Sequence, residues 1–117
     1  MAHSYINLKE LLTRTENDRE LMRDLLSIFK AEFPQRCQAL REAVESLDAT
    51  RVVLEAHALK GMLFNLAANE PAEAVAHLER LGRNKETERF RDSFLLFEII
   101  AQDLSRQVEA CMAEVCG

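Results

Sequence analysis

The segment HALKG at positions 57 to 61 could do chemistry, because it places a lysine and a glycine within little more than a helical turn of a histidine. Imidazole is the side chain that changes charge near neutral pH, and its unprotonated nitrogen is a nucleophile. Lys60 adds a mobile positive charge where an anionic group on His57 would sit. Gly61 costs about 1 kcal/mol relative to alanine inside a helix, so we expect its bare backbone to admit a partner or a bulky group beside His57.

The residues around this segment predict a helix over 49–66. Asp48 is a suitable N-cap, and the apolar residues that follow it recur at steps of three and four. They are Val52, Ala56, Leu59, Leu63 and Leu66. This stripe should face a buried core.

On that helix, His57 should point away from the core. At about 100° per residue from Val52, His57 lies near 140°, Lys60 near 80° and Gly61 near 180°. Apolar residues share this outward side, which predicts a docking patch, since a single stray apolar residue would need no explanation. The predicted partner-binding residues are Val53, Leu54, Phe64 and Ala68.

Before this helix, a longer one is predicted from an N-cap at Asn17, with Glu20 completing a capping box. Its apolar stripe consists of Met22, Leu26, Phe29, Phe33, Cys37, Leu40, Val44 and Leu47. Pro34 removes one backbone donor within this stripe, and we expect a kink there because the stripe resumes in phase.

Two further long helices complete the pattern. Pro71 suits the first turn of a helix over 71–81, and Gly82 and Asn84 should form a short turn after it. The segment from Phe90 to Val115 then alternates apolar steps of four and three, as a bundle seam requires. Residues 6–12 predict a short helix that caps one end of the core. With short loops, the chain should form one all-α domain over residues 1–117, an antiparallel up-down-up-down four-helix bundle.

Composition excludes several classes of function. The net charge is −5 with acids and bases interspersed, which argues against a nucleic-acid partner. No apolar run reaches the roughly 18 to 20 residues of a membrane helix, and the N-terminus lacks a signal-peptide core, so we expect a cytoplasmic domain. The three cysteines should be reduced thiols. The histidines His3, His57 and His77 are scattered, and no glycine-rich nucleotide loop occurs, which predicts neither a metal site nor a cofactor.

The motif formed by His57, Leu59, Lys60 and Gly61 resembles the H-x-L-K-G core of histidine phosphotransfer (HPt) domains. Ala56 before it, the NLAA segment at 65–68 after it, and the helical segment 18–49 look like the same family, so that the resemblance covers roughly residues 5 to 112.

This resemblance implies that His57 accepts a phosphoryl group and exchanges it with an aspartate of a response-regulator receiver domain. Lys60 would balance the phosphate charge, and Gly61 would leave room for the transfer. The chain would be a phosphocarrier without kinase activity of its own, with a receiver domain, a sensor histidine kinase or both as partners, and Mg²⁺ would belong to the receiver. A four-helix bundle that is complete within one chain has no obvious need for a partner subunit, so we expect a monomer.

The resemblance also places Glu79 where some members have a Glu or Gln that hydrogen-bonds the other ring nitrogen. A carboxylate that accepts from Nδ1–H would make Nε2 the better nucleophile. The alternative is a solvated glutamate among the charges of HLERLGRNKE. Met62, Phe64 and Ala67 depart from the small residues or glycine that the family favours, which leaves the identity of the partner open.

Three other functions share features with this one. A histidine-kinase dimerising domain usually has an acidic or amide residue directly after the histidine and a proline soon afterwards. Here Ala58 follows His57, and no proline occurs between His57 and Pro71. The phosphotransfer domain of a chemotaxis-type kinase shares the fold and motif and stays open. So does a helical adaptor, or pseudo-HPt domain, in which His57 is inert and the surface formed by Val53, Leu54 and Phe64 only binds a partner.

Overall fold

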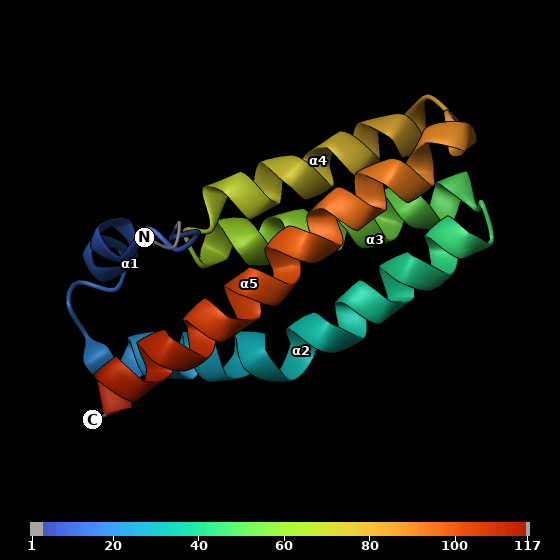
Figure 1. Ribbon diagram of the computed structural model, residues 1–117. Helices are drawn as coiled ribbons and strands as arrows, with labels where there is room; N and C mark the ends of the chain where they lie inside the picture. The colour runs from blue at the N-terminus through green and yellow to red at the C-terminus, as the bar shows by residue number, and fades with distance from the viewer. Residues whose placement is uncertain (1–3, 117) are drawn as a thin grey trace.

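Helices make up nearly all of the computed structural model, which describes residues 4–116, with side chains to residue 114 (Figure 1). They are α1 (Leu8–Arg14), α2 (Arg19–Glu45), α3 (Ala49–Asn65), α4 (Asn69–Arg83), the 3₁₀ turn η1 (Thr87–Arg89) and α5 (Phe90–Cys116). No strand occurs within this described part of the chain. The predicted all-α class is confirmed.

The four long helices close into a ring. In this ring α2 contacts α3 and α5, and α4 contacts the same two helices, so that α3 and α5 lie diagonally opposite each other. Consecutive helices run antiparallel, as Figure 1 shows, which confirms the predicted up-down-up-down bundle. Among the described helices none is both long and apolar enough to span a bilayer.

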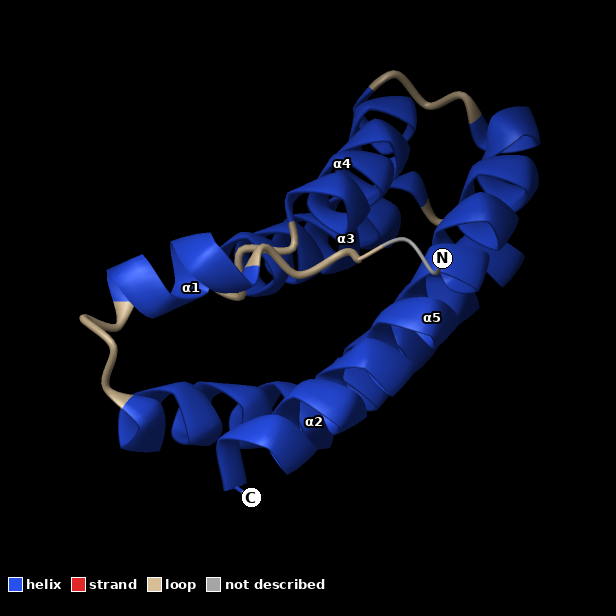
Figure 2. Cartoon of the chain, turned by 60° about the vertical axis from the view of Figure 1, so that its left-hand side comes forward, coloured by secondary structure: helices blue, strands red, loops and turns tan. Residues whose placement is uncertain are grey.

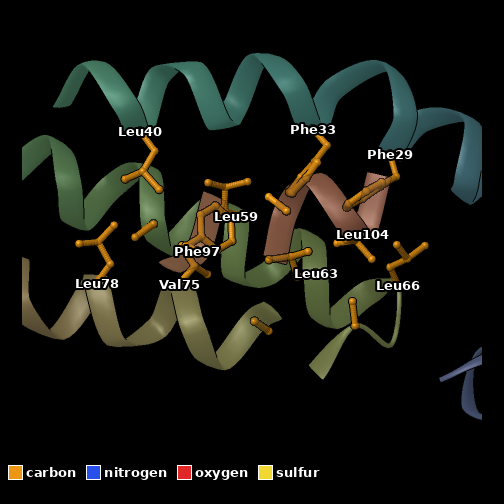
Figure 3. Close-up of a cluster of buried hydrophobic side chains, with 14 of the residues drawn as sticks. Phe29, Phe33, Leu40, Leu59, Leu63, Leu66, Val75, Leu78, Phe97 and Leu104 are labelled. Carbon is orange, nitrogen blue, oxygen red and sulfur yellow. The ribbon is translucent and has the colours of Figure 1, made fainter. Parts of the chain in front are cut away.

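The core fills the space between these helices with side chains from all four (Figure 3). The labelled members are Phe29, Phe33 and Leu40 of α2, Leu59, Leu63 and Leu66 of α3 and its end, Val75 and Leu78 of α4, and Phe97 and Leu104 of α5. Phe33 meets Phe97 edge to face, with ring centroids 6.5 Å apart. The apolar stripes predicted for the four segments therefore face one another, and the burial of this surface is the main force holding the bundle closed.

Helix α1 covers the end of the bundle where α3 turns into α4, as predicted (Figure 2). Leu11 is fully buried there. The Asn7 amide donates to the carbonyl oxygen of Ala67 at 3.0 Å, and Arg14 donates to that of Phe64. Both acceptors lie at the C-terminal end of α3, where carbonyl groups lack helical partners.

Two helix starts differ in how well the sequence predicted them. Asp48 caps α3 as expected, since its side chain accepts from the Arg51 amide at 3.1 Å. The predicted cap at Asn17 is wrong. Asn17 has a φ of 62°, and Asp18 caps α2 instead by accepting from Leu21. Both residues suit an N-cap, and the tight turn before α2 decided between them.

Two other predictions near helix ends are also wrong. Leu47 is 58% exposed because α2 ends at Glu45 and Leu47 takes the left-handed conformation of the connecting turn. Gly82 is not in a turn but inside α4, which runs to Arg83. At Gly82, a Cβ atom would lie 2.9 Å from Cγ2 of Val53, so the missing side chain allows α4 to approach α3 closely.

Pro34 lies within the continuous helix α2. Figure 1 shows α2 changing direction in its middle part. By sequence, Pro34 is close to the middle of this 27-residue helix. A proline inside a helix removes one hydrogen bond and crowds the preceding turn, which accounts for a bend without a break. The apolar stripe of α2 stays buried on both sides of Pro34.

The two helical glycines should respond oppositely to alanine. Gly82→Ala should lower the free energy of unfolding by roughly 1 kcal/mol, because overpacking against Val53 outweighs the gain in helix propensity. Gly61→Ala should raise it by about 0.5 to 1 kcal/mol, because nothing lies within 4 Å of the added Cβ. Urea denaturation of both variants measures this, and equal shifts in one direction would contradict it.

Candidate functional site

His57 stands on the outer side of α3 with 65% of its side chain exposed. Its Nδ1 atom lies 3.2 Å from Oε2 of Glu79 on α4. Glu79 follows His57 by 22 positions in the sequence, and the antiparallel packing of α4 on α3 brings it against the imidazole. The solvated alternative for Glu79 is wrong, since only 4% of its side chain is exposed.

Glu79 gathers three donors around one buried carboxylate. Lys60 Nζ lies 2.7 Å from Oε1, and Arg83 Nη2 lies 2.7 Å from Oε2, the oxygen that also faces His57. We call His57, Lys60, Glu79 and Arg83 the Glu79 cluster. Its members come from α3 and α4 alone.

The cluster keeps Glu79 ionised. Burial favours the protonated carboxyl, but hydrogen bonds from Lys60, Arg83 and His57, with the charge of Lys60, outweigh it and lower the pKa of Glu79 to about 2. At neutral pH Glu79 can only accept hydrogen bonds. A neutral His57 must then donate from Nδ1–H, which leaves the lone pair of Nε2 free and directed away from Glu79.

Gly61 leaves the surface beside His57 open. It lies one helical turn after the histidine and is exposed, and apart from the backbone of its own helix and its chain neighbours no atom lies within 4 Å of where its Cβ would be. No packing within the described chain requires a glycine there, unlike at Gly82. The space is available to a group outside this chain.

A mostly apolar groove of about 470 Å³ adjoins His57 on the side away from Glu79, between α2 and α3. Helix α3 contributes Ala58, Gly61 and Met62, and α2 contributes Leu25, Ile28 and Glu32. Ile28 is 56% exposed. His57 thus lies between a charged cluster and an apolar groove.

The predicted partner-binding residues fall on different surfaces. Leu54 is 62% exposed on the outer side of α3. Val53 is half-buried against Gly82, and Phe64 is half-buried against the core. Ala68 is fully buried, so its placement on the docking face is wrong. The helical periodicity was extended past Asn65, where α3 ends, and α4 covers the side of α3 on which Val53 lies.

Sequence reasoning missed Arg83 and the contribution of α2. Arg83 follows Glu79 by four residues, and such pairs are neighbours on a helix, so this spacing was a usable signal. Ile28 lies off the buried stripe of α2 and is apolar nonetheless. Which face of α3 it borders depends on how α2 packs, and that could not be read from α2 alone.

The remaining reactive side chains lie apart from this site. His77 is exposed, and His3 lies outside the described residues. Burial raises the pKa of the Cys37 thiol to about 12, against a smaller lowering by Arg41, and burial also raises that of Cys111. Both are free thiols, and the side chain of Cys116 lies outside the described part. The described residues contain no group of three metal-ligating side chains.

Comparisons with known proteins agree with this architecture. A family model described as Hpt domain matches residues 24–116. The crystal structure of histidine-containing phosphotransfer protein B (HptB) from Pseudomonas aeruginosa PAO1 is similar, with a TM-score of 0.66 at 21% identity over 91% of this chain and 98% of that one. At 21% identity, the similarity to HptB shows a shared fold alone. A search of curated protein sequences found no match.

The ionised state of Glu79 makes a pH-dependent prediction. The pKa of the Glu79 carboxyl falls from 4.5 in the unfolded chain to about 2 in the folded one. Its ionised form therefore stabilises the fold fully when the pH is above the unfolded pKa, and this contribution is lost as the pH falls through the folded pKa. At neutral pH, the free energy of unfolding of wild type should exceed that of Glu79→Gln by about 1 to 3 kcal/mol. This difference should shrink between about pH 4.5 and about pH 2.

Urea denaturation at a series of pH values measures this difference. Glu73→Gln is the matched control, because Glu73 is an exposed residue of the same helix. The control should show no comparable trend. A wild-type advantage that stays constant down to pH 2 would contradict the assigned role of the carboxylate.

Proposed function

The chain belongs to the Hpt domain family. From this premise we propose that His57 carries a phosphoryl group, which it exchanges with the aspartate of a receiver domain or takes over in a relay that starts at a sensor kinase. The family supports a histidine phosphotransfer module. The observation that carries the assignment to His57 is the contact of its Nδ1 with the buried carboxylate of Glu79, which leaves Nε2 exposed as the nucleophile.

In the proposed reaction, the Nε2 lone pair attacks the phosphorus of a receiver aspartyl phosphate in line with the leaving carboxylate oxygen. A P–N bond forms, the P–O bond breaks, and the aspartate leaves with the electron pair. No proton has to move, because Nδ1 keeps its hydrogen and the imidazole ring becomes positively charged. Glu79 then faces a cation, which lowers the energy of the phosphorylated state.

The neighbouring residues have separate proposed roles. Lys60 supplies positive charge for the phosphoryl oxygens, Glu79 orients the imidazole, and Gly61 gives the partner access. Hpt domains are phosphocarriers without kinase activity, and we extend this to the present chain. The divalent cation that manages phosphoryl charge, Mg²⁺, would be held by the receiver, so no resident cofactor is proposed.

For docking, the groove between α2 and α3 is a better candidate surface than the patch predicted from α3 alone. Leu25, Ile28 and Met62 line it next to His57, and Leu54 extends the same outer side of α3. Apolar side chains beside a reactive group suit a partner that excludes water from the transfer. The ring of helices closes within one chain, which supports a monomer as the unit that binds.

The first test is phosphoryl transfer from a phosphorylated receiver. Wild type should acquire acid-labile, base-stable label, and His57→Gln should acquire none, because amide nitrogen is not a nucleophile of this kind. His77→Gln, another exposed histidine to glutamine change, should still be labelled. Label on His57→Gln would overturn the assignment, and unlabelled wild type that nevertheless binds the receiver would favour the adaptor.

The docking surface has its own test. Ile28→Lys should weaken receiver binding about tenfold, because a charge in the groove must be desolvated on docking. Ile99→Lys is the matched control, since Ile99 is similarly exposed at 61% but lies on α5, diagonally opposite α3. Isothermal titration calorimetry gives both dissociation constants. Equal affinities of the two variants for the receiver would exclude the groove as the docking surface.

A further inference from the structure

The Glu79 cluster contains more positive charge than its carboxylate can balance. Lys60 and Arg83 are cations, Glu79 is the single anion, and both cations contact it directly. Because one carboxylate balances one cation, one positive charge of the cluster is in surplus. A phosphoryl group on the neighbouring Nε2 would bring close to two negative charges to the same place.

The two cations reach Glu79 from opposite ends. Lys60 follows His57 on α3 and so lies toward the turn into α4, whereas Arg83 follows Glu79 on α4 and so lies away from that turn. They also use different oxygens, Lys60 at Oε1 and Arg83 at Oε2. Either one can leave without displacing the other.

We infer that Lys60 exchanges Glu79 for the phosphoryl group when His57 is phosphorylated, and that Arg83 is the positioning residue that makes this exchange favourable. The inference rests on the proposed function of His57. Arg83 stays on Oε2, the oxygen that also faces His57, and keeps both the carboxylate and the imidazole in place.

Lys60 is the cation that moves because of its position and chemistry. It lies three residues after His57 on one helix, so both side chains project from the same face. Its ammonium group has three donors on a flexible stem and can turn from one acceptor to another. Arg83 belongs to the same helix as Glu79, at the i,i+4 spacing of a stable pair.

Without Arg83, the exchange would remove both Lys60 and Arg83 from the buried carboxylate of Glu79 and leave it only the charged imidazole ring of His57. Removing the partner of a buried charge is strongly unfavourable. Lys60 would then stay on Glu79, and the phosphoryl group would form without its counter-charge. The contribution of Lys60 to phosphorylation should therefore depend on Arg83.

Phosphoramidate tests this without a receiver, because it phosphorylates histidine directly. Its nitrogen leaves as ammonia, and the rate of phosphohistidine formation is followed by ³¹P NMR and intact mass. Arg83→Gln should slow formation roughly threefold to tenfold, the size expected for coupled neighbours. Arg83→Lys should recover most of the rate. Lys60→Ala should slow phosphohistidine formation when it is introduced into wild type, but it should slow formation little further when it is added to Arg83→Gln.

Arg80→Gln is the matched control, because Arg80 is an exposed arginine of the same helix with no contact to Glu79. It should leave the rate unchanged. An unaltered Arg83→Gln, an unaltered Lys60→Ala, additive effects in the double variant, or an equal effect of Arg80→Gln would each overturn the exchange while leaving His57 as phosphoryl acceptor. Wild type that is not phosphorylated on His57 would instead overturn the proposed function.

Discussion

The site depends on one buried carboxylate. A charge removed from water needs partners, and Glu79 obtains them from two helices: His57 and Lys60 on α3 and Arg83 on its own helix. The need to satisfy Glu79 fixes which imidazole nitrogen carries the hydrogen and where the positive charge lies. The chemistry at the surface is thus set by a group that is itself almost inaccessible to solvent.

That arrangement requires α3 and α4 to lie close together. Gly82, one turn after Glu79, provides the closeness, because a Cβ there would meet Val53 and Val52. Gly61 has a different effect, because it lies on the outward side of α3 and no other part of the described chain packs against it. Gly82 allows two helices of this protein to pack closely, and Gly61 leaves the surface beside His57 open.

His57 lies at the border between two kinds of surface. On one side lies the charged Glu79 cluster, and on the other lies the mostly apolar groove between α2 and α3. The division follows from the ring of helices, in which α3 has α4 on one side and α2 on the other. A partner on the groove would approach Nε2 without disturbing the hydrogen bond at Nδ1.

The sequence by itself determined the helices, the bundle and the outward direction of His57, because helical periodicity is local and the buried stripes follow from it. It also placed Glu79 as a candidate, through a resemblance rather than through geometry. Only the tertiary structure decided that Glu79 is buried against His57, that Arg83 joins it, that Ala68 is buried and that α2 forms one wall of the apolar groove beside His57. Each of these depends on which neighbour covers which side of α3, and that is settled by packing between helices distant in sequence.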